Sequence, residues 1–210
     1  IYPQLSQWIA DISPRVIVDV GAGQGICSTK LGTDTVRYIG IEPSAHLVER
    51  ARTLYARSTR EFITASAYDI PLQSESADAV FSINTWFHIA DIATASRELA
   101  RILKRGGHFM IITANPSSYD VWETFYSGVR KEGKRLVGSV DILLNPEEKK
   151  ENFKFSRLSK NTLYVHSMDD MTHSLTEAGL YIDSVNELGV TPTAPDKKIF
   201  IKILGSKTYL

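Results

Sequence analysis

Apolar residues occur along this chain in two patterns, short continuous runs and longer stretches with the spacing of an amphipathic helix. Short runs rich in valine and isoleucine are typical of buried strands. They predict strands at 15–20, 36–42, 61–65, 77–83, 107–113, 181–188 and 198–204. The helical spacing predicts helices at 2–12, 24–31, 44–57, 89–104 and 168–178. Strands that alternate with helices favour an α/β fold, in which helices cover both faces of a mostly parallel sheet.

Two parts of the chain depart from this alternation. Only a loop joins the last two predicted strands, so we expect them to pair antiparallel at one edge of the sheet. Residues 116–166 interrupt the pattern after the fifth strand. They open with aromatic residues at helical spacing, namely Tyr119, Trp122, Phe125 and Tyr126. Such a stripe either packs a helix onto the core or forms the wall of a binding pocket.

The first predicted strand leads into a turn with three glycines at alternate positions, Gly21, Gly23 and Gly25. Glycine adopts unusual backbone angles at little cost and lets a ligand approach the backbone closely. The helix that follows offers unpaired N–H groups in its first turn. The turn therefore predicts a nucleotide-like ligand at the carboxyl end of the first strand.

Two common nucleotide-binding motifs do not fit this turn. The dinucleotide fingerprint G-x-G-x-x-G needs a further glycine where this chain has Ile26. The phosphate-binding string G-x-x-x-x-G-K-[ST] occurs nowhere in the sequence. What remains is an alternate-glycine turn that follows an acid, Asp19, by two residues.

Five separate pieces of the chain, in the expected order, resemble the class I S-adenosylmethionine-dependent methyltransferases, and among them the small-molecule enzymes of the ubiquinone-biosynthesis type. The pieces are 18–25, Glu42, 66–72, 76–80 with 87–91, and 98–107. The last matches E-x-x-R-x-L-x-P-G-G, with Arg105 in place of the proline. The resemblance implies a doubly wound, Rossmann-like sheet of seven strands.

The resemblance also implies S-adenosylmethionine as the cofactor and S-adenosylhomocysteine as its product. The implied cofactor-binding residues are Asp19, Gly21, Ala22, Gly23, Gly25, Glu42, Pro43, Ser66, Ala67, Tyr68, Ile83 and Asn84. Glu42 lies 21 residues after Gly21, close to the ~20 expected for an acid that binds the ribose hydroxyls. Asp19 either supports the turn or holds the cofactor's ammonium group through water.

The implied adenine loop differs from the family pattern at one position, because Ser66 stands where an acid is usual. A serine hydroxyl accepts a hydrogen bond less strongly than a carboxylate does. Asp69 is an alternative acceptor, and the backbone N–H of Ala67 faces the adenine ring in this reading. Tyr68 either lies against the adenine or stays at the rim of the site.

Methyl transfer from a sulfonium needs alignment of the two reactants and, where the acceptor loses a proton, a base. His88 is the candidate base, since it follows the fourth strand at the end where such sheets bind substrates. The alternative is that His88 only packs or caps the next helix. Trp86 is a candidate wall of the pocket, and His166 is a further residue that could face it.

Several features restrict the acceptor and the cofactors. Asn84 and Asn115 stand where magnesium-dependent relatives have acids, so we expect no metal. The N-P-P-Y motif of nucleobase amino-methyltransferases is absent after the fourth strand. Basic and acidic residues number 24 each, and this balance argues against a nucleic-acid partner. A small-molecule substrate is therefore expected.

The 210 residues, 43% of them hydrophobic, can form one sizeable core. We expect one domain over 1–210, with 116–166 as an insertion that the resemblance makes a candidate substrate cap. Cys27 is the only cysteine, which excludes an internal disulfide and favours a cytoplasmic location. No apolar run approaches the ~18 residues of a membrane span. A protein or RNA methyltransferase, or a catalytically degenerate interaction module, remains an alternative.

Overall fold

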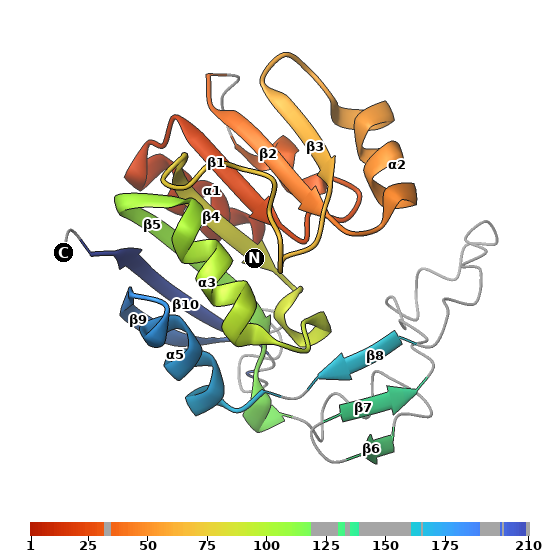
Figure 1. Ribbon diagram of the computed structural model, residues 1–210, viewed down its shortest axis with the longest axis vertical. Coiled ribbons are helices and arrows are strands. Elements are labelled where there is room, and N and C mark those ends of the chain that lie inside the picture. Colours follow the sequence, from red (N-terminus) through yellow and green to blue (C-terminus); the bar gives the residue numbers. More distant parts are fainter. Residues whose placement is uncertain are drawn as a thin grey trace.

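The structure is a computed structural model, and it describes residues 1–31, 35–118, 130–132, 135–138, 161–164, 166–189, 198 and 200–208. Its centre is a seven-stranded sheet with the order β3-β2-β1-β4-β5-β10-β9 (Figure 1). The strands are β1 (Val16–Val20), β2 (Arg37–Glu42), β3 (Arg60–Thr64), β4 (Ala77–Ile83), β5 (Leu103–Ala114), β9 (Leu180–Leu188) and β10 (Phe200–Lys207). The doubly wound α/β sheet predicted from the sequence is confirmed.

Strands β1 to β5 pair in parallel, and β10 runs antiparallel to both of its neighbours, β5 and β9. The predicted antiparallel pairing of the last two strands is therefore confirmed, with β9 as the outermost strand. The strand order reverses between β1 and β4, because the chain moves outward from β1 to β3 and then returns to pair on the other side of β1. In sheets of this kind, ligands bind at the carboxyl ends of the strands beside such a reversal.

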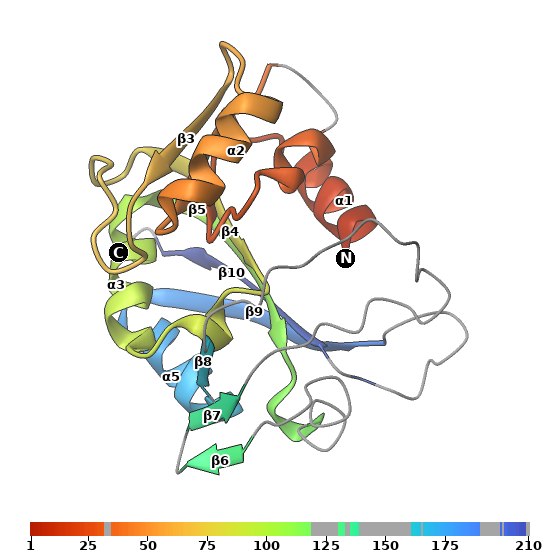
Figure 2. The ribbon, with the colours of Figure 1, turned by 90° about the vertical axis from the view of Figure 1, so that its right-hand side faces the viewer.

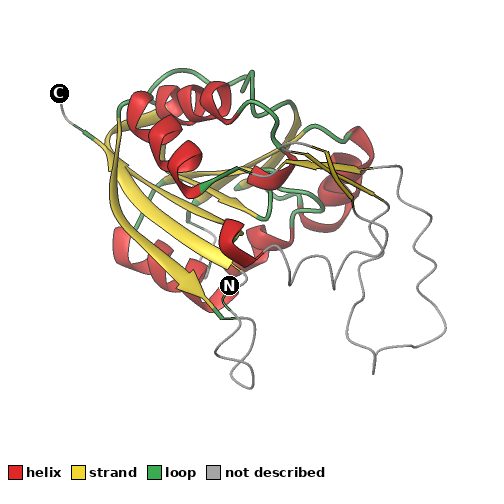
Figure 3. Ribbon diagram, turned by 90° about the horizontal axis from the view of Figure 1, so that it is seen from below, coloured by secondary structure: helices red, strands yellow, loops and turns green. Residues whose placement is uncertain are grey.

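Helices lie on both faces of the sheet, as Figures 2 and 3 show. On one face, α1 (Tyr2–Ile12) and α2 (Ala45–Tyr55) cover a cluster of buried side chains that includes Ile17. On the other face, α3 (Ile92–Ile102) and α5 (Met168–Glu177) cover a second cluster that includes Val18. Successive strand residues point to opposite faces, so these two neighbours belong to different halves of the core.

Several predicted boundaries differ from the structure by one to four residues, and three of the differences have a local cause or compensation. The helix predicted at 24–31 is a short 3₁₀ helix, η1 (Ile26–Lys30), in which the Ser28 hydroxyl donates to the Gly25 carbonyl at 2.6 Å. Helix α3 begins at Ile92, because the Asp91 side chain accepts from the Thr94 N–H and caps the helix there. Strand β5 begins at Leu103, and an irregularity between its pairings with Ala77 and Ala79 takes up the additional residues.

The predicted insertion contains η3 (Pro116–Ser118) and a second, antiparallel sheet of β6 (Arg130–Glu132), β7 (Arg135–Gly138) and β8 (Asn161–Tyr164). Strand β8 contacts η2 (Trp86–His88), the short helix that follows β4. The aromatic stripe at 119–126 lies outside the described residues. Within the described part of the chain, no helix has both the length and the apolar character of a membrane span.

Candidate functional site

The glycine turn after β1 confirms the predicted need for unusual backbone angles. Gly21, Gly23 and Gly25 have φ angles of 84°, 54° and 81°, in the left-handed region that other residues rarely adopt. A Cβ at Gly21 would clash with the Thr85 side chain, and one at Gly25 would come within 2.6 Å of the Phe62 ring. A Cβ at Gly23 would meet no atom within 4 Å, so a ligand could approach the backbone at this glycine.

Hydrogen bonds hold this turn against the end of the neighbouring strand β2. The N–H groups of Gly21 and Ala22 donate to the Ile41 carbonyl at 2.8 and 3.0 Å. The half-buried Glu42 accepts from the Gly23 N–H at 3.0 Å with one carboxylate oxygen. Its other oxygen accepts at 2.9 Å from the N–H of Ser44, which is the N-cap residue of α2. Each carboxylate oxygen can accept more than one hydrogen bond, so Glu42 can still bind a ligand hydroxyl.

Asp19 lies at the carboxyl end of β1, directly below the turn, and is only 1% exposed. One described group donates to it, the Tyr38 hydroxyl of β2, at 2.6 Å from Oδ2. Burial raises the pKa of Asp19 to about 7, the Tyr38 hydrogen bond opposes this rise, and the negative charge of Glu42 adds to it. The position therefore holds an acid that changes charge near neutral pH.

The predicted adenine loop closes on itself through Ser66. The Ser66 carbonyl accepts from the Asp69 N–H at 3.2 Å, and the Ser66 hydroxyl accepts from the Tyr68 N–H at 3.2 Å. The Tyr68 hydroxyl accepts from the N–H groups of Ala90 and Asp91 at 2.8 and 3.2 Å. Tyr68 thus connects this loop to the two residues that precede α3.

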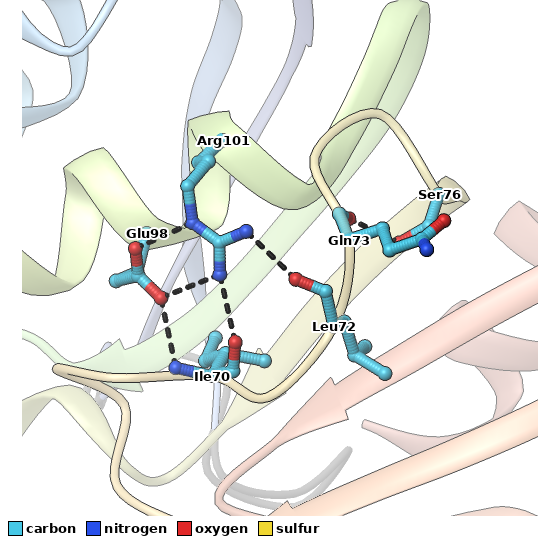
Figure 4. A network of polar contacts seen from close by, with 6 residues as sticks. All are labelled: Ile70, Leu72, Gln73, Ser76, Glu98 and Arg101. Carbon is cyan, nitrogen blue, oxygen red and sulfur yellow. Dashed lines mark hydrogen bonds and ion pairs between the residues drawn. The ribbon is translucent and has the colours of Figure 1, made fainter.

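A charged pair on α3 holds the same loop, as Figure 4 shows. Glu98 accepts from the Ile70 N–H at 2.8 Å, and Arg101 donates to the carbonyls of Ile70 and Leu72 at 2.7 Å each. The two side chains also pair with each other at 2.7 Å, and this contact lowers the pKa of Glu98. The spacing E-x-x-R places both side chains on one side of the helix, since residues three apart are neighbours there.

The segment after β4 faces the glycine turn. Thr85 donates its hydroxyl to the Ile83 carbonyl at 3.2 Å and lies 3.4 Å from the Gly21 carbonyl. Asn84 is exposed and has a φ of 57°, a strained value for a residue other than glycine. Its N–H donates to the Ile112 carbonyl at 2.8 Å, which fixes this backbone conformation.

Comparison with known proteins shows which family this chain is similar to. Residues 18–111 match the family model described as a methyltransferase domain. An O-methyltransferase of Aspergillus nomiae is 29% identical over 113 residues, which are 51% of this chain and 50% of that protein. Over these residues the chain is similar to the class I S-adenosylmethionine-dependent methyltransferases. It spans about half the length of the relatives it matches.

Solved structures have the same fold as this methyltransferase domain at low sequence identity. The S-adenosylmethionine-dependent methyltransferase of Mesorhizobium loti is 20% identical, with a TM-score of 0.69, and the alignment covers 98% of this chain and 96% of that one. A methyltransferase solved in complex with the activator Trm112 of Haloferax volcanii is 18% identical, with a TM-score of 0.65, over 93% and 83% of the two chains. At these identities the likeness concerns the fold.

The residues of this methyltransferase domain fit the family's cofactor. Gly23 leaves its side of the turn open, and the two carboxylates of Asp19 and Glu42 flank the turn. A cofactor that carries an ammonium group, a sulfonium group and ribose hydroxyls suits two acids at this spacing. Pro43 follows Glu42. The two other segments that were predicted to contact the cofactor contain Ser66, Ala67 and Ile83.

His88 ends η2, and its backbone N–H donates to the Thr85 carbonyl at 2.8 Å. Part of the side chain is exposed, yet the protein atoms around the ring remove enough water to lower the pKa of His88. A lowered pKa favours the neutral imidazole, which is the form that a general base requires. Trp86, two residues earlier, packs in the hydrophobic core beneath α3 and α5 and is only 4% exposed.

His166 approaches the same segment from the C-terminal half, with its Nε2 2.7 Å from the Ile89 carbonyl. It also lines a cavity of about 630 Å³ between α3, α5 and the end of β8. None of the predicted cofactor residues lines this cavity, and neither does His88. The open backbone at Gly23 and the two acids belong to the glycine turn and not to this cavity.

The described residues contain no group of three or more His, Cys, Asp or Glu side chains that could hold a metal ion. Sequence reasoning did not anticipate the roles of four residues at the site. Tyr38 and Thr85 carry no motif signal, and the roles of Glu98 and Arg101 were visible only as part of a family pattern. All four act on segments distant in the sequence, such as Asp19 and Ile70.

Proposed function

We propose that this protein transfers a methyl group from S-adenosylmethionine to a small-molecule acceptor. The observation that carries the proposal is the left-handed glycine turn, open at Gly23 and flanked by Glu42 and Asp19. A strand reversal beside this turn is where doubly wound sheets bind ligands. The methyltransferase relatives support the same conclusion.

In this proposal each segment binds one part of the cofactor. Glu42, next to Pro43, accepts hydrogen bonds from the ribose hydroxyls. Asp19 receives the ammonium group through water, because the carboxylate itself is almost fully buried. The cofactor-binding backbone is that of Gly21, Ala22, Gly23 and Gly25, together with Ile83 and Asn84.

The adenine binds at the loop that contains Ser66, Ala67 and Tyr68. Glu98 and Arg101 restrain this loop, so the protein orders the segment before the cofactor arrives. The Ser66 hydroxyl keeps acceptor capacity for the exocyclic amine, although it already accepts from the Tyr68 N–H. We expect this contact to be weaker than one to an acid.

The bound cofactor supplies an activated methyl group on a sulfonium. The protein aligns the acceptor opposite the sulfur, so that the new bond to the acceptor atom forms as the sulfur–methyl bond breaks. His88 takes the proton that an oxygen or nitrogen acceptor loses, and a ring nitrogen holds it until solvent removes it. S-Adenosylhomocysteine is released as the product.

We place the acceptor next to η2, under the insertion at 116–166. Strand β8 of this insertion contacts η2, and His166 reaches the segment just after it. A cap over this region would exclude water from the reacting atoms. The zero net charge of the chain favours a small molecule over a polyanion. A cytoplasmic location rests on the single cysteine alone.

A degenerate interaction module is the second candidate, favoured by the neutral Ser66, whose hydroxyl is already bonded inside its own loop. Calorimetry and thermal unfolding with S-adenosylhomocysteine distinguish the two. We expect binding heat and, at a hundred times the dissociation constant, about 2.7 kcal/mol of added stability. Absence of both would support the degenerate module.

Methyl transfer itself is tested by incubating the protein with labelled S-adenosylmethionine and a panel of phenols, quinone precursors, amines and fatty-acid derivatives. Labelled product from any of these supports a small-molecule enzyme. Labelling of protein or RNA in an extract, with none of the small molecules modified, would instead identify a macromolecular acceptor.

A further inference from the structure

The buried acid of the glycine turn has an incomplete set of partners. Asp19 is 1% exposed, and among the described residues it receives a single hydrogen bond, from Tyr38. A buried carboxylate is usually ion-paired or accepts several hydrogen bonds, because burial without partners is costly. No described lysine or arginine pairs with Asp19. The structure thus maintains a buried acid with acceptor capacity left over, two residues before the first glycine of the turn.

Tyr38 is held in place by the core and not by the site. Its side chain is fully buried on β2, and its ring packs against those of Phe62 and Phe81, with centroids 5.6 and 6.4 Å away. A buried tyrosine hydroxyl needs a partner, and the carboxylate of Asp19 is that partner. The hydroxyl is therefore aimed by aromatic packing that does not depend on a ligand.

The charges around Asp19 oppose its ionisation. Glu42 contributes a negative charge from β2, while Cys27 of η1 and Tyr2 of α1 are close enough for Asp19 to raise the pKa of each. Among the described titratable groups that act on Asp19, the Tyr38 hydroxyl is the one that stabilises the carboxylate. A hydrogen bond that is made to the charged form favours that form.

We propose that Tyr38 is a positioning residue for cofactor binding, because its hydroxyl donates to Asp19 and orients this acid for the ammonium group of the cofactor. This inference rests on the proposed function, since it requires that the cofactor binds at the glycine turn. Tyr38 itself does not touch the cofactor. Its effect passes through Asp19 and therefore depends on the protonation state of that acid.

The test is the variant Tyr38→Phe, which keeps the aromatic packing and removes the hydroxyl. Affinity for S-adenosylhomocysteine is measured by calorimetry between pH 6.5 and 8.5, in wild type and variant. If loss of the hydrogen bond raises the pKa of Asp19 by about one unit, the variant binds about fivefold more weakly at pH 7. At pH 8.5 the two affinities converge, because both carboxylates are then ionised.

The ratio of the two affinities at each pH does not depend on the titration of the ligand's own amino group, because that titration affects both proteins equally. A weakening of equal size at every pH, or none at all, overturns the inference, since a purely structural role would not follow the ionisation of Asp19. The matched control is Tyr181→Phe, on the exposed face of β9, which we expect to bind like wild type at every pH.

A measurement on the wild-type protein keeps the inference testable if Tyr38→Phe does not fold. Binding at pH 7 is measured in two buffers of different ionisation enthalpy, for wild type and for Asp19→Asn. We expect wild type to release about half a proton more than the variant, because Asp19 ionises when the ammonium binds. Equal proton release contradicts the inference. Absence of any binding by wild type would instead refute the proposed function.

Discussion

Two aspartates on neighbouring strands show how the amino ends and the carboxyl ends of the strands in this sheet differ. Asp78, at the amino end of β4, accepts from the N–H groups of Arg15 and Val16 and pairs with Lys104 at 2.6 Å. Burial acts to raise the pKa of Asp78, but Lys104 and these backbone groups together lower it. Asp19, at the carboxyl end of β1, has one donor and a raised pKa.

By this contrast, Asp78 is an acid that stabilises the fold, and Asp19 is an acid that can still bind a ligand. The partners of Asp78 are all supplied by the protein, so folding satisfies it. Asp19 is left with spare acceptor capacity in a place where ionisation is costly, as active sites commonly require. The same edge also carries the left-handed glycines and the strained Asn84.

The largest expected effect is on kcat, and it compares a histidine at the carboxyl ends of the strands with one near their amino ends. His88→Ala should lower kcat about 10²-fold or more, because the acceptor loses its base, while His108→Ala, at the amino end of the β5 pairing with β4, should not change it. In wild type, kcat should fall only at pH values below the ordinary pKa of histidine, because the pKa of His88 is lowered. Steady-state rates between pH 5 and 9 measure both effects, and unchanged turnover in His88→Ala would remove the base from the mechanism.

Replacing each aspartate by asparagine should have opposite effects on stability. Folding raises the pKa of Asp19 from 3.8 to about 7, so its ionisation increasingly destabilises the fold as pH rises through this window. Asp19→Asn should therefore be more stable than wild type above pH 7, by on the order of 1–3 kcal/mol. It should also bind S-adenosylhomocysteine about tenfold more weakly, because the ammonium loses a charged partner.

Asp78→Asn should be less stable than wild type at pH 7 and bind the ligand unchanged. The pKa of Asp78 is lowered by folding, so its contribution is present above the unfolded pKa and is lost as pH falls through the folded value. Urea unfolding at pH 5 and 8 compares both variants with wild type, and unfolding at pH 3 detects the loss of the contribution of Asp78. Two variants that change stability in the same direction would show that the acids do not differ in the way described.

A smaller effect is expected from the pair that holds the adenine loop. Arg101→Lys keeps the charge but cannot make the forked contacts to the Ile70 and Leu72 carbonyls. We expect affinity for S-adenosylhomocysteine to fall about threefold and the amides of 66–72 to exchange hydrogen faster. Arg105→Lys, whose side chain pairs with Glu75 at the surface, is the control and should change neither.

The smallest effect tests Ser66 itself. Ser66→Asp introduces the acid that the family pattern has at this position, and a carboxylate accepts from the adenine amine more strongly than a hydroxyl does. Affinity for S-adenosylhomocysteine should rise by about two- to fivefold, while affinity for S-inosylhomocysteine, which lacks the amine, should not rise. An equal gain for both ligands would show that the adenine amine does not lie at residue 66.

Local signals predicted most of the fold, because they depend on residues close together in the chain. The apolar runs of β1 and β4 were correctly located from sequence. Boundaries were less accurate where side chains compete with helix formation, as the hydroxyl of Ser28 does in η1. The predicted cofactor residues and His88 remain predictions, supported by the geometry of the turn.

Sequence alone was sufficient for the glycine turn, the acid beside it and the alternation of strands and helices, since backbone angles and side-chain periodicity are local properties. Folding decided which groups surround the acid. Tyr38 and Asp19 are 19 residues apart, and Glu98 is 28 residues from the Ile70 amide that it binds. Contacts over such separations, and the loss of water that shifts a pKa, exist only after the strands have paired and the core has closed.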